Sequence, residues 1–203
     1  MAKSTMTLTH NRNGKSFEYN IIDGTRGASV VDSSTCYKDS GMFTYDPGYT
    51  STASCESKIT FIDGENSELR YRGYDIADLA GKHSFLDVSY LLMRGKLPTT
   101  EASKNFDLEI RHRSFLNEGI IRLFDALPDG AHPMATMGAA TMALSAFYKD
   151  HLHLEDEEEF KMMRRRILAK MPVIAAMAYR NSIGTPLIYP DVNKYFTENF
   201  LYM

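Results

Sequence analysis

Residues 59–79, ITFIDGENSELRYRGYDIADL, decide the fold of this chain, because two short runs flank a turn and a helical pattern follows at once. The first run, ITFI, alternates so that successive side chains point to opposite faces of a strand. Asp63 and Gly64 favour a turn, and Leu69 and Tyr71 belong to a returning strand. The stretch therefore predicts a β-hairpin that leads directly into helical structure.

The sequence before this hairpin is typical of short β-strands. The segments MTLTH, SFEYNIID, ASVVD and MFTYD each combine alternation with β-forming residues. Asn-Gly, Asp-Gly and Pro-Gly pairs between them are turn signals. We predict a small β-rich N-terminal region over residues 1–74, which ends in the hairpin.

After the hairpin the apolar residues follow a helical period. Ser84 and Asp87 have the spacing of a capping box, and Gly95 is a stop signal for the helix that they begin. Thr99 or Thr100 begins the next helix. The pattern thus changes from strands to helices within a few residues of the hairpin.

Three further helices are expected in the rest of the chain. One is stopped by Pro128, and the next is opened by Pro133, which suits the first position of a helix. The last is long, begins at Asp156 and is expected to kink at Pro172. We therefore predict a mainly α protein in which residues 75–203 belong to a large helical domain.

Composition and charge exclude several classes of protein. The 203-residue chain has a formal net charge of −3, whereas a general nucleic-acid binder is normally basic. The long uncharged run at residues 132–148 is too short and too rich in small residues to span a bilayer. Cys36 and Cys55 are expected to be reduced thiols, and no signal-peptide core is present. We expect a cytoplasmic protein with no nucleic-acid partner and no membrane segment.

The histidines offer one candidate metal cluster and one candidate catalyst. His151 and His153 lie close to Glu155, but a structural zinc site needs three or four ligands, and the remaining neighbours are acids expected at the surface. We interpret this stretch as a solvated loop before a helix and predict no metal site. His132 precedes Pro133 and is interpreted as a helix-start residue.

Two groups of cations are candidates for phosphate binding. Arg166 and Lys170 lie four residues apart and therefore share one face of a helix. They could hold a phosphate of a nucleotide, or they could form a solvated face balanced by the acidic residues 155–159. Residues 111–113, RHR, carry the same two interpretations. No glycine-rich phosphate-binding motif accompanies either group.

Several long segments resemble, in order, the citrate synthases of the hexameric type found in Gram-negative bacteria. Residues 43–80, FTYDPGYTSTASCESKITFIDGENSELRYRGYDIADLA, carry the strongest likeness. It continues through SYLLMRGKLPT, RLFDALPDGAHPMATMGAATMALSAFYKD, KMPVIAAMAYRNSIGTPLIYP and NFLYM. The resemblance covers nearly the whole chain, and STASCESKITFIDG favours citrate synthase over the related 2-methylcitrate synthase.

The resemblance implies a fold and an activity. The β-rich region would be followed by the first helices of the large helical domain of a citrate synthase-like fold. Such enzymes condense acetyl-CoA with oxaloacetate to citrate and CoA at the entry to the tricarboxylic acid cycle. Acetyl-CoA is a substrate, and no cofactor is implied. Because the resemblance implies an enzyme about twice the length of this chain, beyond one usual domain, we expect the chain to be the N-terminal portion of one.

The catalytic residues of the family are not matched in this sequence. Its catalytic histidines lie in HGGANE and GHRVY, which do not occur here, and its catalytic aspartate belongs to the other half of the enzyme. We therefore name no catalytic residue and expect the chain alone to be inactive. A part of a 2-methylcitrate synthase, or a non-catalytic module that dimerises or binds a nucleotide, remain as alternatives.

The resemblance also implies partners and regulation. Helices at residues 132–148 and 157–180 resemble those of the family's dimer interface, and the full-length enzymes form hexamers. Enzymes of this type are often inhibited by NADH away from the catalytic centre. The matching positions are Tyr148, Arg166, Lys170, His112, Arg113 and Ser114. The family has arginine, histidine and threonine at the last three positions, and Val192 stands where it has an asparagine.

Overall fold

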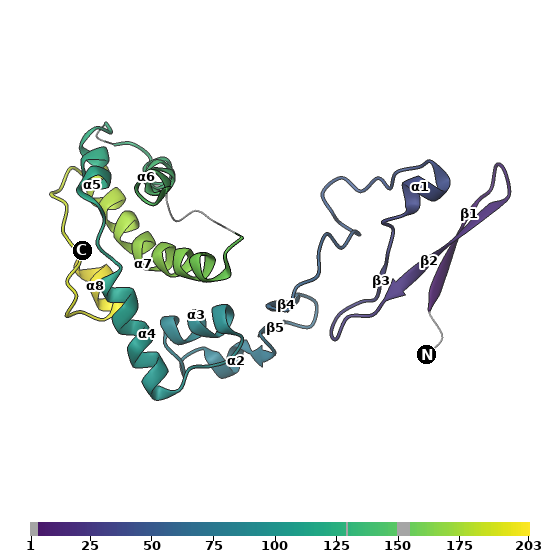
Figure 1. Ribbon diagram of the computed structural model, residues 1–203, viewed down its shortest axis with the longest axis horizontal. Helices are drawn as coiled ribbons and strands as arrows, with labels where there is room; N and C mark the ends of the chain where they lie inside the picture. The colour runs from purple at the N-terminus through teal and green to yellow at the C-terminus, as the bar shows by residue number, and fades with distance from the viewer. Residues whose placement is uncertain (1–3, 129, 150–154) are drawn as a thin grey trace. The chain divides into compact units, whose positions relative to one another are not determined.

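The computed structural model describes residues 4–128, 130–149 and 155–203 (Figure 1). The chain is mainly helical with small antiparallel sheets. It divides into two compact units, of which the first contains residues up to 84 together with 91–96, and the second contains residues 85–90 and 97–203. Residues 75–84 thus lie in the same unit as the hairpin, beyond the predicted end of the β-rich region.

A three-stranded antiparallel sheet begins the first unit. Its strands are β1 (Thr5–His10), β2 (Lys15–Ile22) and β3 (Val30–Val31), in the order β1-β2-β3. The β1–β2 register places Met6 opposite Tyr19 and Leu8 opposite Phe17, so that apolar side chains share one face of the sheet. Strands in MTLTH, SFEYNIID and ASVVD were predicted, and the structure confirms them.

The predicted strand at MFTYD is wrong. Residues 42–46 form no strand, and the preceding residues form a helix that the sequence did not predict, α1 (Cys36–Ser40). Phe43 stacks on Tyr37 of this helix with ring centroids 4.1 Å apart. Asp46 accepts hydrogen bonds from the backbone N–H groups of Thr50 and Ser51. Local hydrogen bonds of this kind compete with strand pairing.

The predicted hairpin is present. Strands β4 (Thr60–Asp63) and β5 (Glu68–Tyr71) pair antiparallel, β5 pairs with β6 (Tyr74–Asp75), and α2 (Ile76–Leu79) follows at once. The Asp63 carboxylate accepts the backbone N–H groups of residues 65 and 66, which fixes the turn. Arg72, between β5 and β6, has a φ of 50° and donates to the carbonyl of Leu92 at 2.8 Å.

Four longer helices begin where the sequence predicted: α3 (Phe85–Arg94), α4 (Thr100–His112), α6 (Pro133–Phe147) and α7 (Glu157–Ser182). Helix α5 (Glu118–Asp125) forms in the predicted segment before Pro128, and α8 (Phe196–Tyr202) was not predicted. The side chains of Thr99 and Asp156 accept backbone N–H groups at the starts of α4 and α7. Helix α7 continues through Pro172. Among the described residues, no helix is long and apolar enough to cross a membrane.

The hydrophobic core of the second unit lies between α5, α6 and α7, which pack together (Figure 1). Ile120, Phe124 and Ile174 have no exposed surface. Gly119 permits a close approach here, because a Cβ at this position would lie 2.6 Å from the ring of Phe147. This core fixes the helices that carry the candidate site.

Candidate functional site

Lys170, a predicted phosphate-binding residue, lies inside the helical unit. It belongs to the middle of α7 and is only 4% exposed. Its ammonium group donates to the backbone carbonyls of Phe115 and Arg113, the latter at 3.0 Å. Burial, and then the charges of Arg166 and Arg113, lower the pKa of Lys170 to about 8. Its charge is therefore already engaged by two carbonyls of the segment after α4.

Tyr148 joins the two predicted cations of α7. It follows the last residue of α6, and the centroid of its ring lies 4.6 Å from the guanidinium carbon of Arg166. The ammonium nitrogen of Lys170 lies 5.8 Å from the same centroid. Both are cation–π distances. The structure thus brings Tyr148, Arg166 and Lys170 together, with Arg166 the more exposed of the two cations.

Residues 112–114 contribute to this cluster mainly through their backbone. The Arg113 side chain is paired with Glu109, with Nε and Oε1 2.9 Å apart. The buried Ser114 hydroxyl donates to the carbonyl of Arg111 at 2.7 Å. His112, the last residue of α4, is exposed. Of the three predicted side chains, only that of His112 is exposed to solvent.

An ion network beside this cluster ties α4 to α7. Oε1 of Glu109, in α4, lies 2.9 Å from Nε of Arg113 and 2.9 Å from Nη1 of Arg165, which belongs to α7. All three side chains are partly buried. Neither Glu109 nor Arg165 was predicted from the sequence as a site residue. The i,i+4 spacing of Glu109 and Arg113 was a usable signal for one pair, whereas the contact with α7 joins residues far apart in the chain.

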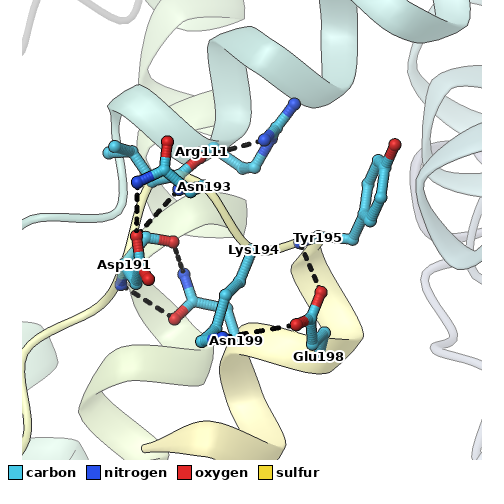
Figure 2. Close-up of polar contacts among 8 residues, drawn as sticks. Arg111, Asp191, Asn193, Lys194, Tyr195, Glu198 and Asn199 are labelled. Carbon is cyan, nitrogen blue, oxygen red and sulfur yellow. Dashed lines mark hydrogen bonds and ion pairs between the residues drawn. The ribbon is translucent and has the colours of Figure 1, made fainter.

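A second polar cluster surrounds Arg111 of α4 (Figure 2). Arg111 pairs with Asp107 at 2.8 Å and donates to the carbonyl of Val192 at 2.9 Å. Its guanidinium carbon lies 5.3 Å from the centroid of the Tyr195 ring. The first arginine of the RHR segment therefore holds the chain before α8 against α4.

Asn199 of α8 closes the same segment from the other side (Figure 2). It is 5% exposed, and its amide group exchanges two hydrogen bonds of 3.0 Å with the backbone of Asp191. The hollow beside it has a volume of about 10 Å³, which is room for about one water molecule. The hydrogen bonds of Asn199 hold α8 against the segment before it. The hollow is too small for an organic substrate. A polar residue within the apolar stretch NFLYM was the signal that could have found Asn199.

The histidine predictions have two outcomes. His132 begins α6 as predicted, since its Nδ1 accepts the backbone N–H of Met134 at 3.2 Å. His151 and His153 lie outside the described residues. Within residues 4–128, 130–149 and 155–203, no group of three His, Cys, Asp or Glu side chains is placed to hold a metal ion.

Known proteins match this chain in both sequence and fold. The family described as "Citrate synthase, C-terminal domain" matches residues 48–203. The citrate synthase of Helicobacter pylori strain J99 is 45% identical over 200 residues, which are 98% of this chain and 47% of that protein. The chain therefore spans about half the length of this relative.

Solved structures agree with this result. The crystal structure of citrate synthase from Pyrobaculum aerophilum has a TM-score of 0.72 and 25% identity, and covers 100% of this chain and 46% of its own. That of Thermotoga maritima has a TM-score of 0.66 and 29% identity, with coverages of 79% and 41%. These matches agree with the mainly α fold of the chain. The chain belongs to the citrate synthase family.

Proposed function

We propose that this chain is part of a citrate synthase, which condenses acetyl-CoA with oxaloacetate to citrate and CoA at the entry to the tricarboxylic acid cycle. The observation that carries the proposal is the 45% identity to a citrate synthase along 98% of the chain. We further assign it to the hexameric type of Gram-negative bacteria and to the cytoplasm. The chain supplies scaffold in this proposal, and the acid–base groups come from the rest of the enzyme.

The test is CoA release by the full-length protein that contains this sequence. With oxaloacetate as the second substrate, acetyl-CoA is expected to release free thiol much faster than propionyl-CoA. A clear preference for propionyl-CoA would instead indicate a 2-methylcitrate synthase. No release with either thioester would overturn the proposed activity.

The proposal includes a homodimer formed through α6 and α7. The support is the composition of α6, which carries no charged residue, and the exposure of Met134 and Met142 at 67% and 75%. Exposed apolar surface of this kind favours association. Small residues on the same helix, Gly138 and Ala139, permit close helix packing.

Sedimentation of the chain with and without a charge on α6 tests this interface. Met142→Glu is expected to shift a dimer toward the monomer. Leu108→Glu is the matched control, since Leu108 is an exposed apolar residue of α4. Equal sedimentation of the two variants, or a monomer for the unchanged chain at all concentrations, would contradict the proposed interface.

A second candidate function is allosteric binding of NADH. The observation that favours it is the placement of Arg166 and Lys170 around the ring of Tyr148. Because Lys170 is committed to backbone carbonyls, Arg166 is the residue proposed to contact a phosphate. Guanidinium groups suit that contact because they donate two parallel hydrogen bonds.

NADH fluorescence in the full-length protein tests this role. Arg166→Ala should weaken binding by about tenfold, the effect of one charge-assisted hydrogen bond. Arg164→Ala is the control, because Arg164 lies on the same helix and stacks on Phe160 instead. Equal effects of the two changes, or no binding by the unchanged protein, would contradict the candidate function.

A further inference from the structure

The loop between β1 and β2 contains an Asn-Gly pair, the only one in the sequence. Asn13 and Gly14 are both exposed, and Gly14 has a φ of 72°. A Cβ built at Gly14 would have no other atom within 4 Å, so the loop leaves open space around this peptide bond. Because glycine lacks a side chain, another group can approach its backbone nitrogen closely.

The Asn13 side chain is folded back onto its own backbone. Its Oδ1 accepts the backbone N–H of Lys15 at 3.0 Å, which forms an Asx turn. This hydrogen bond draws electron density from Cγ and makes that carbon more electrophilic. The N–H of Gly14 donates to the carbonyl of His10 at 2.9 Å. Gly14 can therefore act as a nucleophile only when this turn hydrogen bond opens.

We propose that Asn13 is a site of spontaneous deamidation. Hydroxide removes the proton of the Gly14 backbone nitrogen, which attacks Cγ of Asn13. The Cγ–Nδ2 bond breaks, ammonia leaves after taking up a proton, and a cyclic imide remains. Water then opens the imide at either carbonyl to give aspartate or isoaspartate. The net reaction converts an amide and water into an acid and ammonia, and needs no other reactant.

Two other asparagines, Asn66 and Asn199, are held in ways that oppose this reaction. The Nδ2 of Asn66 donates to the Asp63 carboxylate at 2.8 Å, so that the leaving nitrogen is engaged. Asn199 is buried, and its Nδ2 donates to a backbone carbonyl. Both are followed by residues with side chains, which hinder ring closure. Asn13 differs from both in its following glycine, and from Asn199 also in its exposure.

The modification changes the first hairpin in two ways. Either product adds a negative charge beside Lys15, the first residue of β2. Isoaspartate also inserts an extra carbon into the backbone of the turn. This insertion disturbs the pairing of His10 with Lys15, which closes the β1–β2 register.

Peptide mapping of the intact chain during incubation in mildly alkaline buffer tests the proposal. Asn13 is expected to lose its amide severalfold faster than Asn66, with isoaspartate as a product that accepts a methyl group from isoaspartyl methyltransferase. Gly14→Ala is expected to slow the reaction severalfold, and circular dichroism checks that the chain stays folded. An Asn13 amide that outlasts the Asn66 amide, or an unchanged rate in Gly14→Ala, would overturn the proposal.

Discussion

In the helical unit, α5, α6 and α7 surround a shared core in which Phe124 and Ile174 have no exposed surface. The β-rich unit has a much smaller set of buried apolar side chains among its described residues: Tyr19, Cys36, Leu79 and Leu91. Instead, its loops are fixed by carboxylates that accept backbone N–H groups, as at Asp46 and Asp63. Since burial of apolar surface is the dominant favourable term in folding, most of the stability is expected to reside in the helical unit.

The largest expected effect comes from the helical core. Phe124→Ala removes a fully buried ring and should lower the free energy of unfolding by about 3–5 kcal/mol. Phe43→Ala is the matched change in the β-rich unit, where the ring is 78% exposed. It should change the free energy of unfolding by no more than about 0.5 kcal/mol. Urea denaturation measures both, and similar losses would contradict the comparison.

The buried ammonium of Lys170 is the next expected contributor. Lys170→Met leaves two carbonyls without their donor and should cost about 1–3 kcal/mol at neutral pH. Denaturation midpoints of the two proteins measure this loss. A variant as stable as the unchanged chain would mean that the carbonyls find other partners.

The same pair of proteins gives a pH test. The pKa of Lys170 falls from 10.5 to about 8 on folding. Between these two pKa values the unfolded chain binds more protons than the folded chain, so the free energy of unfolding rises with pH in this window. Below the window Lys170 is protonated in both states and adds no pH dependence. The unchanged chain should therefore gain stability relative to Lys170→Met as the pH rises above about 8. A relative loss over the same range would contradict the lowered pKa.

Arg72 tests how the hairpin is fastened. Arg72→Ala removes the hydrogen bonds to the carbonyl of Leu92 and should cost about 1–3 kcal/mol. Arg72→Gly removes the same hydrogen bonds, but glycine adopts a positive φ without steric cost. The Arg72→Gly variant should therefore be more stable than the Arg72→Ala variant by about 1 kcal/mol. Denaturation of both variants, followed by hydrogen exchange in the hairpin, measures the difference. The reverse order would contradict the role of the backbone conformation.

The smallest effect is expected at the exposed loop of Asp46. Hydrogen bonds from Thr52, Ser51 and Thr50 hold the pKa of this carboxyl well below its ordinary value of 3.8. A lowered pKa contributes stability above 3.8, which is lost as the pH falls below it. NMR titration of the Thr50 amide should show the loop opening only in strong acid, and opening already at an ordinary carboxyl pKa would contradict these contacts.

The sequence predicted local features well, because their signals lie within a few residues. The hairpin followed from alternation around Asp63, and the helix starts at Thr99 and Asp156 followed from their capping side chains. The partners of Lys170 could not be predicted, since the Arg113 and Phe115 carbonyls are 57 and 55 residues away in the chain. A cation on a helix face has the same sequence pattern whether it meets solvent or buried carbonyls.

The most direct test of this account is CoA release by the 203-residue chain alone, given acetyl-CoA and oxaloacetate. In the proposed enzyme this chain supplies scaffold and interface, and no catalytic residue is assigned to it. We therefore expect no thiol release above background, while the full-length protein is active under the same conditions. Clear turnover by the chain alone would contradict the account and would require an acid–base group among the residues assigned here to structure.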